Sequence, residues 1–308
     1  MKLLEAIEKY PNVKKAYEML PTLYGDEKRI SGQKWSEHAI AVAETVAEID
    51  LDEQSITTAL LHDVIERGKM TLEQVESQFD TEIALLVDGV RDIRKYSDKL
   101  DEQEVELEDF RRLILKTAQD IRVMMVRIAE KMDSLKTIGS LSEEKKLNGI
   151  RRSKQIYARL CEYLGISSWQ QFFEDKSFEL EKPKEYGIIK SEIDRIEKEH
   201  ATILQELKSE VEELLGQNVN LIEIKFRRKG IFSSYKKIRR KHLGEEEELS
   251  AEHVKKLNDL LAMRVIVDKV EECYLVLGLV HKEFSYNPEE FDDYIVNPRP
   301  NGYRSIHT

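Results

Sequence analysis

The sequence has 308 residues, of which 41% are hydrophobic and 35% are charged, and its formal net charge is −11 at pH 7. This length and composition are typical of a globular protein with about two domains. The acidic excess argues against direct binding to DNA or to anionic membranes, because a polyanion would be repelled over most of the surface. Any anion site must therefore be local.

Neither a signal peptide nor a membrane span is apparent, because no apolar run is long enough, and this predicts a cytoplasmic protein. The two cysteines, Cys161 and Cys273, lie far apart without metal-ligand spacing. Their separation fits a reducing compartment and predicts two buried small side chains rather than a disulfide.

Residues 1–165 carry apolar residues at helical spacing, which predicts an all-helical domain. One helix is expected over SEHAIAVAETVAEI, with Ser36 as its cap. Another is expected over DEQSITTALLHDVIERG and ends at Gly68, and the next opens with a capping box of Thr71 and Gln74. A later helix, TAQDIRVMMVRIAEKMDSLKTIGSL, is strongly apolar. Its few polar residues each require a role: Asp120, Glu130, Lys131 and Asp133.

Residues 166–205 are rich in charge and predict long surface helices that form a connector rather than a core. Residues 206–308 predict a mixed α/β domain, because VNLIEIKF and LLAMRVIVD are short, β-branched and bounded by polar segments. Between these strands lies KFRRKGIFSSYKKIRRK, with nine Lys or Arg and no acid, and GEEEEL follows it. This basic run is either a solvated charge run or a polyphosphate site.

A metal site is suggested by His62 and Asp63, which are adjacent in the sequence. His38 lies on the preceding helix, Glu66 is one turn beyond Asp63, and Glu130 interrupts a later apolar helix. Two imidazoles with carboxylates suit Mn²⁺, Fe²⁺ or Mg²⁺ better than a structural zinc. Such an ion would activate water for attack on phosphorus.

A nucleotide site is suggested in the second half. Asp259 precedes a strand, where a carboxylate can reach a cation or simply cap the element. Near the end of the chain, Arg299, Asn301 and Tyr303 combine a guanidinium, an amide and an aromatic face, a combination that suits a purine nucleotide. No GxxxxGK[ST] loop is present, so an ATP site would have to use side-chain cations.

Five segments in order, HDVIE, DIRVMMVRIAEKMDSLKTI, FRRKGIFSSYKKI, DLLAMRV and FDDYIVNPRPNGYRSIHT, resemble the long RelA/SpoT homologues. These stringent-response enzymes make and degrade (p)ppGpp. The resemblance covers nearly the whole chain. It implies a helical HD-type hydrolase domain in residues 1–165, a helical connector in 166–205, and part of a nucleotidyltransferase-like synthetase domain in 206–308.

For the first domain, the resemblance implies a Mn²⁺ site made by His38, His62, Asp63 and Glu130. It also implies a catalytic Glu66 and a nucleotide contact from Arg29. The sequence departs from the family pattern at three positions, Arg67, Glu130 and Ser134. Arg67 replaces a carboxylate and would put a cation where water activation needs negative charge. A site that binds metal but hydrolyses poorly is therefore expected.

For the second domain, the resemblance implies ATP contacts from Arg227, Lys229 and Lys237, a catalytic Mg²⁺ ligand in Asp259, and support from Arg264. GDP or GTP would be held by Arg299, Asn301, Tyr303 and His307, with Tyr303 stacked on guanine. The nucleotide 3′-hydroxyl would attack the β-phosphorus of ATP and release AMP. The run EFDD, residues 290–293, resembles the acidic variant of synthesis-specialised members.

The family's second synthetase carboxylate and its regulatory domains, through which a parent enzyme could engage the ribosome, are expected beyond Thr308. The chain is therefore expected to be truncated and inactive in synthesis. Three hypotheses follow: a (p)ppGpp synthetase with a degenerate hydrolase domain, a Mn²⁺-dependent (p)ppGpp hydrolase that still works, and a non-catalytic nucleotide-binding regulator.

Overall fold

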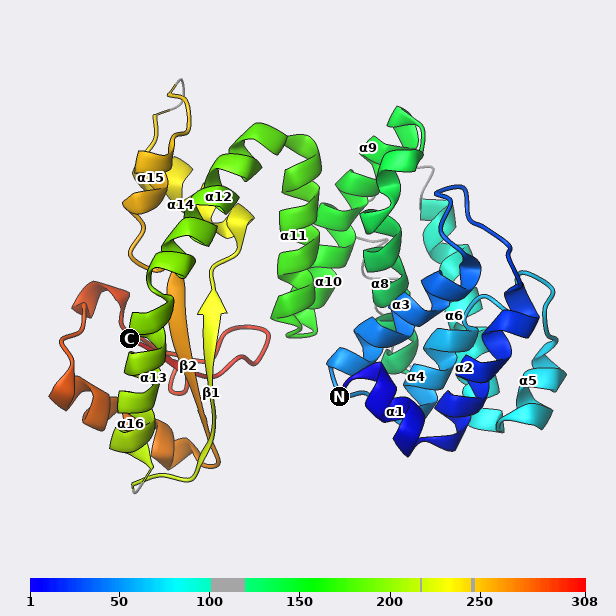
Figure 1. Ribbon diagram of the computed structural model, residues 1–308, viewed down its shortest axis with the longest axis horizontal. Coiled ribbons are helices and arrows are strands. Elements are labelled where there is room, and N and C mark those ends of the chain that lie inside the picture. The colour runs from blue at the N-terminus through cyan, green and yellow to red at the C-terminus, as the bar shows by residue number, and fades with distance from the viewer. Residues whose placement is uncertain (101–119, 217, 245–246) are drawn as a thin grey trace. The chain divides into compact units, whose positions relative to one another are not determined.

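The computed structural model describes residues 1–100, 120–216, 218–244 and 247–308, with side chains described only as far as residue 95 in the first range. It divides into two compact units, Met1–Tyr157 and Ala158–Thr308 (Figure 1). The start of one expected helix, residues 117–119, and Glu245 and Glu246 of the acidic run lie outside these ranges. Within them, no helix combines the length and the apolar character needed to cross a lipid bilayer.

In the described part of the first unit the regular elements are all helices, as expected, apart from an isolated β-bridge between Lys28 and Lys34. Its α-helices are α1 (Leu3–Lys9), α2 (Pro11–Tyr24), α3 (Trp35–Glu48), α4 (Glu53–Leu61), α5 (Leu72–Gln78), α6 (Thr81–Leu100), α8 (Ile121–Lys136) and α9 (Glu143–Arg152). A 3₁₀ turn, η1 (Ile138–Ser140), and a π-helical turn, η2 (Ser153–Tyr157), complete it.

Helix α4 forms the centre of this unit. Residues 55–61 are all buried, and α4 packs against α2, α3, α6 and α8. Helix α3 contributes Val42, Ala43 and Val46 to the same core, and α8 contributes Ile128 and Ala129. Polar side chains near the end of α4 or on the inner faces of α3 and α8 are consequently held in a buried space.

Two helix boundaries differ from the sequence expectations. Helix α3 begins at Trp35 with Lys34 as its N-cap, so Ser36 lies in the first turn. Helix α4 ends at Leu61 rather than continuing to Gly68, which adopts φ +64° within the turns that follow. This early end places His62 and Asp63 just beyond the helix, at the edge of the core. The capping box of Thr71 and Gln74 is confirmed.

The second unit is mixed α/β, as expected. Its helices are α10 (Ala158–Tyr163), α11 (Ser167–Glu181), α12 (Pro183–Glu199), α13 (Ala201–Leu215), α14 (Ile231–Lys241), α15 (Ala251–Lys255), α16 (Val270–Glu283) and a 3₁₀ turn, η3 (Pro288–Glu290). Its strands are β1 (Leu221–Arg228), β2 (Leu261–Val267), β3 (Asp292–Asp293) and β4 (Ile306–His307).

Strands β1 and β2 pair antiparallel, with Lys225 opposite Arg264 and Arg227 opposite Ala262. One face of this pair packs on α13 and α16 through Ile224 and Met263 (Figure 1). Side chains alternate along a strand, and directly opposite residues share a face. Lys225, Arg227 and Arg264 therefore lie on the other face, and all three are exposed.

The helices expected as a connector contribute to a core of their own. Phe178 of α11 and Ile189 and Ile193 of α12 are buried with Ile231 and Ile238 of α14. The charged residues of these helices lie on their outer faces. The overall composition of the segment therefore does not reveal the apolar stripe that packs in the core. The boundaries expected at 165 and 205 remain predictions.

We expect Phe178→Ala to lower the free energy of unfolding of the second unit by about 3–5 kcal/mol. The Phe178 ring is 1% exposed and contacts the rings of Tyr186, Phe232 and Tyr235. Urea unfolding of a Trp35→Phe background, followed by the fluorescence of Trp169, would measure it. The exposed control Tyr163→Ala should change stability by less than about 0.5 kcal/mol, and an equally small effect of Phe178→Ala would restore the connector interpretation.

Candidate functional site

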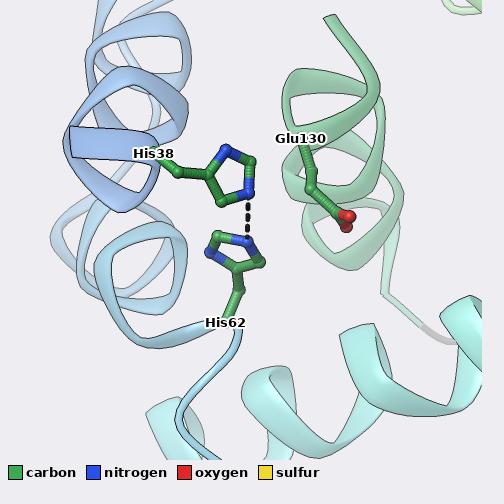
Figure 2. Close-up of side chains that lie close together, drawn as sticks. All are labelled: His38, His62 and Glu130. Carbon is green, nitrogen blue, oxygen red and sulfur yellow. Dashed lines mark hydrogen bonds between the residues drawn. The ribbon is translucent and has the colours of Figure 1, made fainter. Parts of the chain in front are cut away.

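Two buried histidines face each other in the first unit. The Nε2 atoms of His38, on α3, and His62, just after α4, are 3.3 Å apart. His62 Nδ1 donates to the carbonyl oxygen of Ala59 at 2.7 Å, and His38 Nδ1 donates to Asp133 at 2.6 Å. These bonds fix the tautomers, so both Nε2 lone pairs point into the same space. Figure 2 shows this pair beside Glu130 of α8.

Two carboxylates complete the buried cluster. Asp63 Oδ2 lies 3.4 Å from His62 Nε2 and 3.8 Å from His38 Nε2. Glu130 Oε2 is 2.6 Å from Arg127 Nη1 and 2.9 Å from Arg94 Nη2. Burial favours the neutral acid, but Arg127 and Arg94 outweigh it and hold the pKa of Glu130 well below its usual value.

The donor set fits a divalent metal. Single ligand atoms from His38, His62 and Glu130 lie within 4.8 Å of one another. Two nitrogens about 2.1 Å from one ion and at right angles would be about 3.0 Å apart, close to the observed Nε2 separation. Burial lowers the pKa of His62, which favours the neutral imidazole that a metal requires. The structure thus brings together all four residues expected to bind metal.

Arg29 is anchored to α8 beside this cluster. Its guanidinium donates to Asp133 at 3.1 Å and to Ser134 Oγ at 3.2 Å. Asp133 therefore links Arg29 to His38. The sequence pattern indicated that a polar residue on this apolar helix needs a role, but it did not indicate which one. The role of Arg29 in nucleotide binding stays a prediction.

Contrary to the expectation from the sequence, the Arg67 side chain does not place its cation where water activation would need negative charge. Its guanidinium carbon is 3.7 Å from the centroid of the Trp35 ring, and Nη2 is 3.8 Å from Glu27. The cation that contacts Asp63 and Glu66 is instead Arg94 of α6, a residue for which no sequence pattern indicated a role. Glu66 is thereby engaged in an ion pair, and its catalytic role stays a prediction.

In the second unit, Asp259 lies just before β2 and gathers two lysines. Its Oδ2 is 2.6 Å from Lys229 Nζ and 2.9 Å from Lys237 Nζ. Burial alone would raise the pKa of Asp259, but the hydrogen bonds from Lys229 and Lys237 keep it below its usual value. Lys237 also approaches Glu290 at 3.5 Å.

The other Asp259 oxygen supports a role in cation binding. Oδ1 is buried, and it has no hydrogen-bond partner among the described residues. A buried carboxylate oxygen without a partner is uncommon and needs an explanation. Mg²⁺ prefers carboxylate oxygen as a ligand, so Asp259 fits the ion implied by the resemblance.

Aromatic and cationic side chains near the end of the chain form a second cluster. The rings of Tyr294, Tyr303 and His307 have centroids 5.1 to 6.1 Å apart. The Arg299 guanidinium lies 4.4 Å from the centroid of Tyr294 and 5.8 Å from that of Tyr303. Tyr294 belongs to this cluster although the sequence assigned it no contact.

The Asn-Gly turn shapes this segment. Gly302 has φ +78°, a conformation that glycine adopts without strain. Asn301 accepts a hydrogen bond from the Tyr303 amide at 3.1 Å and donates to the carbonyl oxygen of Glu162 at 3.0 Å. Asn301 therefore stabilises the turn that presents Tyr303, and a direct nucleotide contact from it stays a prediction.

The stability of the second unit should fall as pH decreases from about 7.5 to 5.5. The pKa of His307 is lowered, first by burial and then by the positive charges of Arg299, Arg227 and Arg264. The negative charge of Asp292 acts in the opposite direction but does not cancel this effect. The unfolded chain then binds more protons in this window, below about pH 6.5, so acidification favours unfolding. Urea titrations at both pH values would measure the change. His307→Gln should reduce the pH dependence, whereas His200→Gln, an exposed control, should not; equal slopes would contradict the assignment.

Two family signatures match the chain. Residues 16–167 match the family described as "HD domain", and residues 226–308 match the "Region found in RelA / SpoT proteins". A GTP pyrophosphokinase rsh of Brucella ovis is 31% identical and covers 99% of this chain and 40% of its own length. A GTP pyrophosphokinase of Myxococcus xanthus is 34% identical, with 96% and 38% covered. A guanosine-3′,5′-bis(diphosphate) 3′-pyrophosphohydrolase of Aquifex aeolicus is also 34% identical, with 96% and 41% covered.

The fold and these matches define a helical HD domain followed by a mixed α/β RelA/SpoT region. The chain spans about two fifths of the length of these relatives. It belongs to the RelA/SpoT homologue family, as the ordered sequence motifs predict.

Proposed function

We propose that the second unit supports pyrophosphoryl transfer from ATP to the 3′-hydroxyl of GDP or GTP. The observation that carries this proposal is Asp259 with Lys229 and Lys237 at the end of the β1–β2 pair. Arg227 and Arg264 lie on the exposed face of the same strand pair, and their positive charges contribute to the lowered pKa of His307. A cationic surface beside an aromatic cluster suits a nucleotide pair that carries several phosphates.

The chemistry requires charge neutralisation more than a reactive side chain. In the proposed reaction, the 3′-hydroxyl releases its proton to solvent and its oxygen forms a bond to the β-phosphorus of ATP. The bond from that phosphorus to the α–β bridging oxygen breaks, and AMP leaves with that oxygen. Lys229, Lys237 and Arg227 would stabilise the charge on the transferred group. Asp259 would hold Mg²⁺, which would supply further charge neutralisation for the phosphates. Since these nucleotides are cytoplasmic, we place the reaction in that compartment.

We further propose that the first unit binds Mn²⁺ through His38, His62, Asp63 and Glu130. A divalent ion there would supply a more acidic water for attack on the 3′-pyrophosphate of (p)ppGpp. This proposal is supported by the two buried histidines, because hydrogen bonds from their Nδ1 atoms leave both Nε2 atoms available to a metal ion. Glu66 is tied to Arg94, so its carboxylate is less available as a base, and slow hydrolysis is the expected outcome.

One chromatographic assay separates the three hypotheses. The protein is incubated with ATP, GDP or GTP and Mg²⁺, and separately with ppGpp and Mn²⁺. Formation of AMP with ppGpp or pppGpp supports the synthetase, and release of pyrophosphate from ppGpp supports the hydrolase. Nucleotide binding without either product would favour the non-catalytic regulator as the role of these 308 residues.

A further inference from the structure

A buried arginine occupies the carboxylate side of the candidate metal site. The Arg94 side chain, on α6, is only 12% exposed. Its Nη1 bonds both Asp63 Oδ1 and Glu66 Oε2, and its Nη2 is 2.9 Å from Glu130 Oε2. One guanidinium therefore collects carboxylates from the turn after α4 and from α8.

This contact already neutralises much of the local charge. Three carboxylates, those of Asp63, Glu66 and Glu130, face two guanidiniums, those of Arg94 and Arg127. The cluster thus keeps one net negative charge before any metal arrives. A divalent ion would leave it with one net positive charge unless a guanidinium withdrew.

The arginine and the expected metal depend on the same two carboxylates. Asp63 is divided between them, because Oδ1 bonds Arg94 while Oδ2 faces the Nε2 atoms of His38 and His62. Glu130 also has its Oε2 bound by Arg94. An ion held by the histidines and Glu130 would stand close to the guanidinium, in a buried space where like charges repel strongly.

We propose that Arg94 is an internal counter-cation that competes with the divalent metal for Asp63 and Glu130. Metal binding then requires Arg94 to release these carboxylates, so the metal-free state is stabilised and the affinity for the ion is lowered. The inference rests on the proposed metal-binding function of the first unit. The opposite role, in which Arg94 orients the carboxylates for the metal, makes the opposite prediction for metal affinity.

The test is Mn²⁺ binding to the wild-type protein and to Arg94→Gln, both prepared free of metal. Calorimetric titration, or the electron paramagnetic resonance signal of free Mn²⁺, measures the dissociation constant. We expect Arg94→Gln to bind Mn²⁺ at least about 10-fold more tightly, because removing a nearby positive charge favours a bound cation. The matched control Arg91→Gln lies on the same helix, pairs with Asp88 and should leave the affinity unchanged.

Thermal unfolding provides a second readout that does not depend on turnover. Arg94→Gln should melt at a lower temperature than wild type in EDTA, because the buried carboxylates lose their cation. Added Mn²⁺ should raise its melting temperature more than that of wild type. If Arg94→Gln does not fold without metal, Arg94→Lys keeps the charge, and it should bind Mn²⁺ no more than a few-fold more tightly than wild type.

The outcomes separate this inference from the proposed function. Equal or weaker Mn²⁺ binding by folded Arg94→Gln, with wild type binding normally, would overturn the competition. Binding by Arg94→Gln alone, with none by wild type, would support it in its strongest form. Failure of both proteins to bind Mn²⁺ would overturn the metal site itself, whatever the second unit does in synthesis.

Discussion

Asp259→Asn is expected to lower pyrophosphoryl transfer from ATP by at least about 100-fold in any form of the protein that carries out synthesis, since a metal ion contributes several kcal/mol of transition-state stabilisation. The substitution keeps the size of the side chain but removes the charge that Mg²⁺ requires. It also removes the anion that holds Lys229 and Lys237 within 3 Å. The rate of AMP formation with GDP as acceptor measures the loss.

The same variant can be tested by binding alone. Freed from Asp259, Lys229 and Lys237 can approach the phosphates, so ATP without Mg²⁺ should bind as tightly as in wild type or more tightly. The benefit of added Mg²⁺ should disappear. Asp268→Asn, just after β2, is a control that should behave as wild type. If Asp259→Asn retained the full effect of Mg²⁺, the ion would have to bind to other ligands.

Asp63→Asn is expected to weaken Mn²⁺ binding by at least about 100-fold, because even changes in the partners of metal ligands cost 10- to 100-fold in affinity. The amide retains the shape of the side chain, but it lacks the negative charge that faces both imidazoles. Equilibrium titration of metal-free protein with Mn²⁺ measures the dissociation constant. Asp92→Asn, an exposed change on α6, should have no effect.

The Asp63 prediction has its own contradictory outcome. Unchanged Mn²⁺ affinity in folded Asp63→Asn would show that His38, His62 and Glu130 hold the ion without it. Single ligand atoms of those three residues lie within 4.8 Å of one another. Combining Asp63→Asn with His62→Ala would then locate the remaining ligands.

Glu130 could be anticipated because it interrupts an apolar helical pattern, and His62 because it is adjacent to Asp63 in the sequence, with His38 on the preceding helix. A polar residue on a buried face needs a partner, so such residues tend to meet. The two strands could be anticipated for a similar reason, since β-branched runs between polar segments have few alternatives. These features depend on local sequence and on the requirement to bury apolar surface.

The contacts of Arg94 could not be anticipated in this way. Arg94 lies in a charged stretch of α6, and only the packing of that helix against α4 and α8 directs it to Asp63 and Glu130. The end of α4 at Leu61 cannot be predicted from periodicity, because the helical pattern continues past it in the sequence. The position of Arg67 on Trp35 likewise depends on the turns after α4, which no periodicity specifies.

The environments of the two cysteines have a practical consequence for labelling. Cys161 is fully buried in α10, and burial raises the pKa of its thiol to about 12, so its reactive thiolate is scarce at neutral pH. Cys273 on α16 is partly exposed, so the prediction that both cysteines are buried is wrong for this one. A maleimide dye should therefore modify Cys273 first in the native protein, without any engineered cysteine. The second unit thus carries a natural attachment point for a fluorophore.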